Sequence, residues 1–99
     1  MSTLNPEHLS AVIHAINISP FFKHMSMIVT EIGTGYSIVA AEIRHEHMNP
    51  FGGLHGGVYS AIIDSAAYCA AYSELPEEYG LVSIDLKIDF LAPVTEGKI

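Results

Sequence analysis

The chain has 99 residues, and its 11 Asp and Glu against 4 Lys and Arg give a formal net charge of -7 at pH 7. This length suits one small domain, and the acidic balance leaves no basic surface to neutralise phosphates, which argues against a nucleic-acid partner. Hydrophobic residues make up 49% of the chain and charged residues 15%, a composition that excludes intrinsic disorder and predicts self-association.

The first predicted element is a short amphipathic helix. Asn5 is a capping residue, and Pro6 stands at the first helical position. Apolar side chains then recur at intervals of three and four residues: Leu9, Ile13 and Ile16. The helix is expected to end near Ser19 and Pro20.

Two antiparallel strands joined by a tight turn are predicted next. The first strand is expected over Met25 to Glu31, and the residues Gly33-Thr34-Gly35 suit a turn. The second strand is expected over Tyr36 to His47, because apolar and polar residues alternate in its later part.

The most apolar segment runs from Val58 to Ser73. Twelve of its sixteen residues are hydrophobic, and its only charged residue is Asp64. A helix that is apolar on every side is a buried helix, so the segment predicts a helix in the core.

The clearest strand pattern covers Val82 to Phe90, where apolar and polar residues alternate without interruption. Pro93 is expected to end this strand, and Glu96-Gly97 suits a turn. A further strand should begin at Lys98-Ile99, so the sequence predicts a chain truncated at its C-terminus.

The glycine-rich turn before the apolar helix indicates an anion site. Adjacent glycines at a helix start allow another molecule to approach the backbone closely. The first-turn N–H groups have no intrahelical partners and lie at the positive end of the helix dipole, so they can hold an oxyanion. The alternative, that Gly52, Gly53, Gly56 and Gly57 only shape a turn, stays open.

Asp64 lies within the apolar helix with no Lys, Arg or His within one turn of it. Burial of an unpaired carboxylate costs several kcal/mol, so Asp64 needs a partner elsewhere, a proton or a wet cavity. The alternative is that Asp64 reaches solvent or hydrogen-bonds a neighbouring strand.

Gly57 and Asp64 share one helix face, but their positions are about 10 Å apart along the axis. A carbonyl held by the Gly57 N–H needs its base or nucleophile within about 3 to 3.5 Å of the reacting carbon. If both residues serve one reaction, the protein must be a dimer whose sites combine Gly57 of one subunit with Asp64 of the other.

The segment from His47 to Gly57, followed by Asp64 and by residues 82–93, closely resembles the hotdog-fold acyl-CoA thioesterases of the phenylacetic-acid-degradation type. The Asn, His-Gly-Gly and Asp at these spacings carry the resemblance, which extends from about Ser19 to the last residue. It implies an α+β fold, with a curved antiparallel sheet wrapped around one long hydrophobic helix, and assembly into homodimers and homotetramers. We expect residues 1–99 to form a single, incomplete hotdog domain with a short N-terminal helix, because relatives continue through further strands. In the family's strand order those strands lie between the first two strands and the Val82 to Phe90 strand.

The resemblance also implies hydrolysis of an acyl-CoA thioester without a cofactor or metal. The Gly57 N–H and the Asn49 side chain would polarise the thioester carbonyl, and Asp64 of the partner subunit would activate water or attack as nucleophile. His55 would support the carbonyl-binding turn, and Ser83 would orient the water. Three further residues are expected to contact the substrate: Gly56, Phe51 and Tyr68.

Other readings of these residues stay open. His45 and His47, two apart on the predicted strand, could ligate zinc or iron with His55, but no third ligand has convincing spacing. Hotdog folds also host acyl-thioester dehydratases and hydratases, and His55 with Asp64 could serve that chemistry, although the tandem glycines and Asn49 match the thioesterase pattern. The remaining alternative is a non-catalytic remnant that binds acyl-CoA.

Cys69 stands alone in the chain, so it cannot form an internal disulfide. Its alanine-rich surroundings predict a small core residue without a catalytic role. The first residues do not show a basic start followed by an apolar core, and the sequence has no uncharged run of membrane-spanning length. We therefore expect a soluble cytoplasmic protein with no membrane partner.

Overall fold

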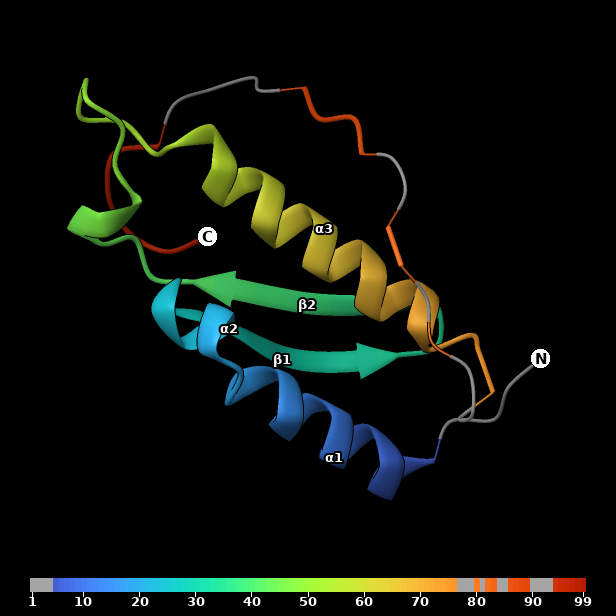
Figure 1. The fold of residues 1–99 in the computed structure, drawn as a ribbon. Helices are drawn as coiled ribbons and strands as arrows, with labels where there is room; N and C mark the ends of the chain where they lie inside the picture. The colour runs from blue at the N-terminus through green and yellow to red at the C-terminus, as the bar shows by residue number, and fades with distance from the viewer. Residues whose placement is uncertain (1–4, 77–79, 81, 84–85, 90–93) are drawn as a thin grey trace.

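A computed structural model of the chain describes residues 5–76, 80, 82–83, 86–89 and 94–99. The elements follow in the order α1 (Pro6–Asn17), α2 (Pro20–His24), β1 (Met27–Gly33), β2 (Tyr36–Ala41), a 3-10 turn (His45–His47) and α3 (Gly56–Tyr72) (Figure 1). No helix in this part of the chain is long and apolar enough to cross a membrane.

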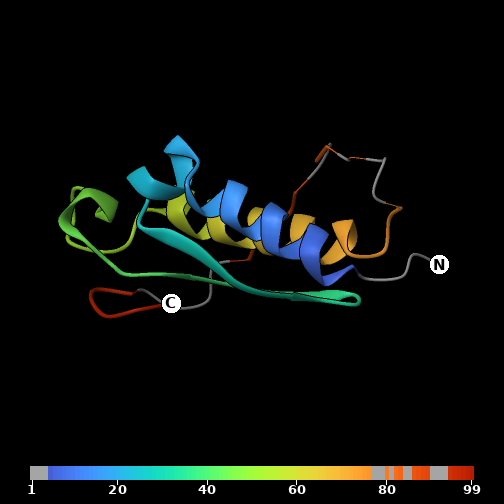
Figure 2. The same ribbon diagram turned by 90° about the horizontal axis from the view of Figure 1, so that it is seen from below.

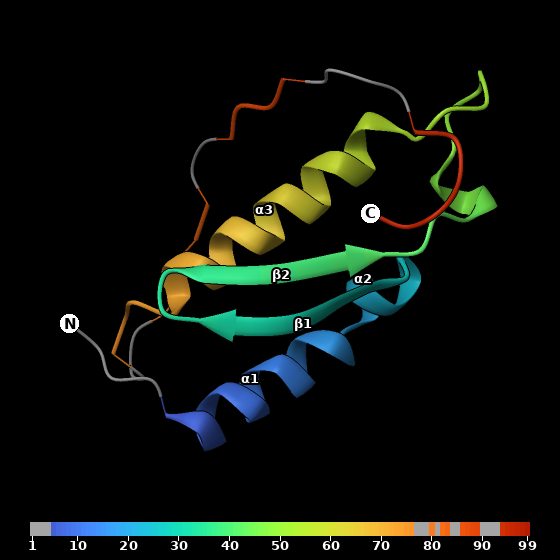
Figure 3. The ribbon, with the colours of Figure 1, turned by 180° about the vertical axis from the view of Figure 1, so that it is seen from behind.

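The described elements form two layers. β1 and β2 pair as an antiparallel hairpin, and α1 and α3 lie on the same face of it (Figure 2). Figure 3 shows the opposite face, where the hairpin lies in front of α3. The core between the layers joins buried side chains of both strands with one from α2 and one from α3: Phe22, Met27, Val29, Ile32, Ala41 and Cys69.

The predicted N-terminal helix is confirmed as α1. The Asn5 side chain accepts hydrogen bonds from the Glu7 and His8 backbone N–H groups, and Pro6 opens the helix. The helix ends at Asn17, whose side chain donates to the Val29 carbonyl at 3.0 Å and accepts from the Val29 N–H at 2.8 Å. This pair of hydrogen bonds fixes the end of α1 to β1. The short helix α2, which begins at Pro20, was not predicted.

The hairpin is confirmed, with its strands shifted from the predicted bounds. The register pairs Met27 with Ala41 and Gly33 with Tyr36, with a bulge between Val29 and Glu31. In the turn, Gly35 adopts a φ of +75°, a conformation that glycine tolerates at little cost.

The prediction that the second strand continues to His47 was wrong. Ser26 has a φ of 54°, which turns the chain away just before β1, so β2 has no partner in β1 beyond Ala41. Residues 45–47 instead form a 3-10 turn in which the Arg44 N–H donates to His47 Nδ1 at 2.8 Å. His45 and His47 therefore do not share a strand face.

The predicted apolar helix is confirmed as α3, which begins two residues earlier than expected. The prediction that it is buried on every side was wrong for the described structure, in which only Val58 and Cys69 of this helix are buried. One side of α3 packs on the hairpin, where the Ser37 hydroxyl donates to the Ala66 carbonyl at 2.7 Å. Ile63, with 41% of its surface exposed, marks a part of the helix that the described residues do not cover.

The strand predicted over Val82 to Phe90 is wrong for the residues that can be tested. Residues 84, 85 and 90 lie outside the described residues, and residues 82, 83 and 86–89 are not in a strand. A strand needs the hydrogen bonds of a neighbouring strand, and the described residues Ser83 and Leu86 line a cavity along α3 instead.

The start of a further strand at the C-terminal end is confirmed. Lys98 forms an antiparallel bridge with Glu42, and the Ala41 N–H donates to the Ile99 carbonyl at 2.7 Å. Gly97, with a φ of +101°, provides the predicted turn. The last residues therefore occupy the edge of β2 that β1 leaves free.

Candidate active site

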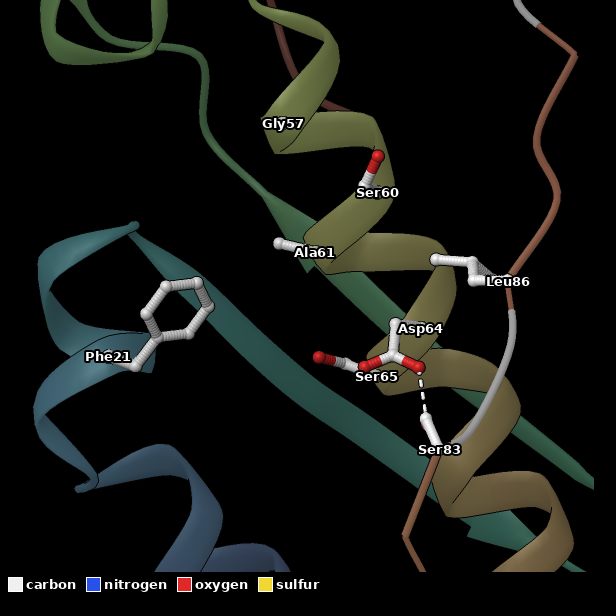
Figure 4. A pocket seen from close by; sticks show the side chains of 8 residues that line it. All are labelled: Phe21, Gly57, Ser60, Ala61, Asp64, Ser65, Ser83 and Leu86. Atoms are coloured by element: carbon white, nitrogen blue, oxygen red, sulfur yellow. Dashed lines mark hydrogen bonds between the residues drawn. The ribbon is translucent and has the colours of Figure 1, made fainter.

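Asp64 lies in the middle of α3 and is half-buried. One of its oxygens, Oδ1, accepts a hydrogen bond of 2.6 Å from the Ser83 hydroxyl (Figure 4). No ion pair involves this carboxylate within the described residues. The lone acid of the apolar helix thus finds a neutral partner from a segment nineteen positions away in the chain.

Asp64 lines a cavity of about 510 Å³. Its lining joins the N-terminal half of α3 with one aromatic residue of α2 and two residues of the segment beside α3 (Figure 4). These residues are Phe21, Gly57, Ser60, Ala61, Asp64, Ser65, Ser83 and Leu86. Gly57 and Asp64 therefore lie along one wall of the same cavity, two helical turns apart.

The Gly57 N–H, the expected oxyanion donor, already has a partner. It donates to His55 Nδ1 at 2.7 Å, so the His55 side chain caps α3. This bond requires a neutral imidazole whose proton sits on Nε2. A carbonyl oxygen can accept a hydrogen bond from the Gly57 N–H only if the His55 ring moves away or if this N–H donates to both acceptors at once.

Asn49 organises the turn before α3. Its Oδ1 accepts from the Phe51 N–H at 2.8 Å and from the Gly53 N–H at 3.0 Å. Its Nδ2 has no hydrogen-bond partner within the described residues and is left as a donor. Asn49 does not line the cavity of Asp64 in the described structure.

The predicted substrate contacts fall in different places. Phe51 is 94% exposed at the tip of the turn and lines neither cavity near Asp64. Gly56 is the first residue of α3, and its carbonyl accepts from the Ser60 hydroxyl at 3.0 Å. Tyr68 lies one turn beyond Asp64 and lines a second cavity together with it.

The second cavity, of about 430 Å³, lies between the N-terminal helices and α3. Phe21, Asp64 and Ser65 line both cavities. Sequence reasoning did not single out Phe21, Ser60 or Ser65. Ser19 and Pro20, which precede Phe21, indicate the end of a helix. They do not indicate which distant helix the Phe21 side chain will face.

A metal centre at the histidines is not supported. No group of three or more His, Cys, Asp or Glu side chains in the described part of the chain could hold a metal ion. His47 is buried, and both of its ring nitrogens are engaged, by the Arg44 N–H and by the Met25 carbonyl at 2.6 Å.

Cys69 is the small core residue that the sequence predicted. Its side chain is buried within the core cluster. Burial raises the pKa of the Cys69 thiol above its ordinary value, because the thiolate loses its hydration. A raised pKa disfavours a nucleophilic role.

Comparison with known proteins gives concordant matches. The family model described as the thioesterase superfamily matches residues 51–99, which include Gly57, Asp64 and Ser83. A protein from Haemophilus influenzae named as an esterase is 30% identical over 77 residues, covering 78% of this chain and 56% of its own length. The chain thus spans little more than half of the curated relatives that it matches.

Solved structures show the same arrangement of elements. A thioesterase from Haemophilus influenzae superposes with a TM-score of 0.79 at 27% identity, covering 98% of this chain and 65% of the other. A mutant of a phenylacetic acid degradation protein from Thermus thermophilus superposes with a TM-score of 0.71 at 28% identity, covering 81% of this chain and 67% of the other. The hairpin, the long helix α3 and the N-terminal helices correspond to part of a hotdog fold.

Proposed function

The chain belongs to the thioesterase superfamily, and from this premise we propose that it hydrolyses an acyl-CoA thioester to the free acid and CoA. One observation carries the proposal: the Asp64 carboxylate in the middle of α3 lines a cavity and accepts a hydrogen bond from Ser83. Acyl transfer needs a carboxylate or similar base and a donor for the developing oxyanion. Each chain supplies the base at this cavity and the donor two helical turns away, at the Gly57 N–H near the start of α3.

In the proposed reaction Asp64 acts as the general base. Its carboxylate takes a proton from water while the water oxygen forms a bond to the carbonyl carbon, and the carbonyl oxygen becomes an oxyanion. The C–S bond then breaks, and the CoA sulfur leaves with the electron pair and recovers a proton from Asp64. Ser83 holds Oδ1, which leaves Oδ2 for the water.

The Gly57 N–H and the Asn49 Nδ2 group stabilise the oxyanion in this scheme. For this, the Gly57 N–H exchanges His55 Nδ1 for the substrate oxygen. The exchange keeps one acceptor on the helix start at each stage, so binding does not leave that N–H unsatisfied.

The two halves of the site come from different subunits. Seven residues of α-helix separate Gly57 from Asp64, a rise of about 10 Å. The attacking oxygen must lie within about 3 to 3.5 Å of the carbonyl carbon, and the base must lie within hydrogen-bond distance of the attacking water. A two-fold axis that places Asp64 of one α3 near Gly57 of the other meets this requirement. We therefore propose a dimer, or a tetramer of such dimers, as the active form.

Hybrid dimers test this arrangement. Asp64→Asn removes the base, and Gly57→Pro removes the N–H donor at a first-turn position that tolerates proline. Each variant alone should lose most of its activity with acyl-CoA substrates, measured as free thiol released. Mixed subunits should recover about one quarter of the wild-type activity, because half of randomly formed dimers are hybrids and each hybrid has one intact site.

Gly57→Ala is the matched control, since it keeps the N–H and adds only a methyl group that would lie 3.0 Å from His55 Nδ1. Absence of recovery in subunits shown to exchange would refute the shared site. Conversion of the acyl chain without thiol release would favour a dehydratase or hydratase, and binding of acyl-CoA without either reaction would favour a non-catalytic protein.

A further inference from the structure

His47 is a buried histidine that has no part in the proposed reaction. Only 1% of its surface is exposed, and each ring nitrogen bonds to a backbone group. Nδ1 accepts a hydrogen bond of 2.8 Å from the Arg44 N–H, and Nε2 lies 2.6 Å from the Met25 carbonyl oxygen. A carbonyl oxygen can only accept and a backbone N–H can only donate, so the ring must be neutral with its proton on Nε2.

The ring of His47 joins two segments that lie 22 positions apart in the chain. Met25 follows α2, and its N–H donates to the Phe21 carbonyl at 2.9 Å. Phe21 in turn lines the cavity of Asp64 (Figure 4). The hydrogen bond from His47 to Met25 therefore attaches the 3-10 turn to a helix that carries one wall of the candidate active site.

The loop that follows His47 carries the proposed oxyanion donors. The His55 N–H donates to the His47 carbonyl at 2.8 Å, and the next pair of residues inward forms an antiparallel bridge. His47 thus stands at the base of a closed loop. This loop contains Asn49 and leads directly into Gly57 at the start of α3.

We propose that His47 is a positioning residue for the oxyanion donors, and that it acts through its hydrogen bond to the Met25 carbonyl. This inference rests on the proposed hydrolysis, because the donors need a fixed position only where an oxyanion forms. His47 lines neither cavity near Asp64. It fixes the base of the loop against the end of α2, and a displacement of about 1 Å at a catalytic group can lower the rate about 10²-fold.

A second hydrogen bond joins the same two segments, but it is exposed. The Arg44 Nη1 group donates to Ser26 Oγ at 3.0 Å, where water can replace either partner. Water has little access to the His47 ring, because this residue is buried. The contact between His47 and Met25 should therefore hold the loop more firmly than the contact between Arg44 and Ser26.

Two replacements of His47 separate its two ring contacts. In His47→Gln the side-chain NH2 group extends to the place of Nε2 and can donate to the Met25 carbonyl, but the Arg44 N–H loses its acceptor. In His47→Asn the side-chain oxygen takes the place of Nδ1 and can accept from Arg44, but the shorter side chain leaves the Met25 carbonyl without its donor. Each variant leaves one backbone group unpaired, so the two should lose similar thermal stability.

His45→Gln is the matched control, because His45 belongs to the same 3-10 turn and is exposed. The test compares the melting temperature of each variant with kcat/KM for one acyl-CoA, measured as thiol release. His47→Asn should lower kcat/KM about 10²-fold, whereas His47→Gln, which restores the donor, should keep most of the activity, as should the control.

A merely structural role would lower kcat/KM equally in His47→Asn and His47→Gln, and that result would overturn the inference. If His47→Asn does not fold, His47→Gln decides alone: retained activity supports the contact with Met25, and lost activity overturns it.

Two measurements do not depend on the proposed hydrolysis. Long-range proton–nitrogen NMR spectra of the wild-type protein should show His47 with a protonated Nε2 and an unprotonated Nδ1, and the other tautomer or a doubly protonated ring would overturn the inference. The His55 N–H should exchange with solvent about tenfold faster in His47→Asn than in His47→Gln. If this difference appears while no acyl-CoA is hydrolysed, the contact that holds the loop stands and the proposed reaction fails. If both variants hydrolyse thioesters equally fast, the reaction stands and the positioning role of His47 fails.

Discussion

The hydrogen bond between Ser83 and Asp64 should make the effects of mutating these residues non-additive. Ser83 Oγ lies 2.6 Å from Asp64 Oδ1, and a hydrogen bond to a charged group contributes about 1.5 to 3 kcal/mol. Because Ser83 is exposed, water replaces part of this interaction, and we expect a loss near the lower limit. Ser83→Ala should therefore reduce kcat/KM about tenfold.

Asp64→Asn should reduce kcat/KM by about 10² to 10⁴, the usual contribution of a general base. In the proposed reaction the Ser83 hydroxyl acts only by orienting the carboxylate. The double variant should consequently be no less active than Asp64→Asn alone. A four-member cycle of kcat/KM values, measured by thiol release from one acyl-CoA, gives the coupling directly.

Ser37→Ala is a suitable control for this cycle. Ser37 also donates to α3, at 2.7 Å to the Ala66 carbonyl, but on the side that faces the hairpin. Its loss should lower the free energy of unfolding without a tenfold loss of kcat/KM. If Ser83→Ala costs a further tenfold in the Asp64→Asn background, Ser83 acts independently of Asp64 and the reasoning is refuted.

Three further predictions concern the turn and the core. His55→Ala should lower the free energy of unfolding by about 1 kcal/mol, because it removes the cap of α3; thermal unfolding should shift down by about 4 to 8 °C, whereas His55→Asn should retain the cap and the melting temperature. Asn49→Asp keeps the oxygen that accepts from Phe51 and Gly53 but removes the Nδ2 donor, so kcat/KM should fall about 10² or more with the melting temperature retained. Burial raises the pKa of the Cys69 thiol above its ordinary value of 9.0. The thiol therefore ionises in the unfolded chain before it does in the folded protein, and the free energy of unfolding should fall as the pH rises above 9.0. Urea titrations of Cys69→Ala should not show this fall.

The elements predicted correctly are those whose signals are local. Asn5 and Pro6 start α1 through contacts within one turn, and Gly35 shapes the hairpin through its own backbone angles. The end of β2 could not be predicted in this way. It depends on Ser26, fifteen positions before Ala41, where the chain turns away and removes the partner strand.

The segment 82–90 shows the limit of periodicity. Its alternation is a property of side chains, whereas a strand also requires backbone hydrogen bonds to a neighbour. Among the described residues of this segment, Ser83 donates a hydrogen bond to Asp64 of α3, and Leu86 lines the same cavity as Asp64. The family resemblance implied that Ser83 orients the attacking water, but it did not predict the hydrogen bond that Ser83 donates to Asp64.

The cavity itself depends on contacts that no local pattern encodes. Asp64 stood out because a lone acid in an apolar helix is costly to bury. Phe21 gave no comparable signal, since an aromatic residue after a proline fits many environments. Only the packing of α1 and α2 beside α3 brings Phe21 to both cavities.

The glycine at position 57 has a structural reason that is separate from catalysis. A Cβ there would lie 3.0 Å from His55 Nδ1 and 3.3 Å from His55 Cε1, closer than side chains normally pack, so glycine lets the capping ring lie against the backbone without shifting. The same N–H that holds the ring is the donor expected to hold the substrate oxygen. The His-Gly-Gly sequence therefore stabilises the start of the helix, and it leaves the Gly57 N–H accessible both to the histidine ring and to a substrate carbonyl. Two turns of α3 separate the Gly57 N–H from Asp64 of the same chain, and the helix fixes this separation. A second subunit is therefore the direct way to bring an Asp64 carboxylate to the Gly57 N–H.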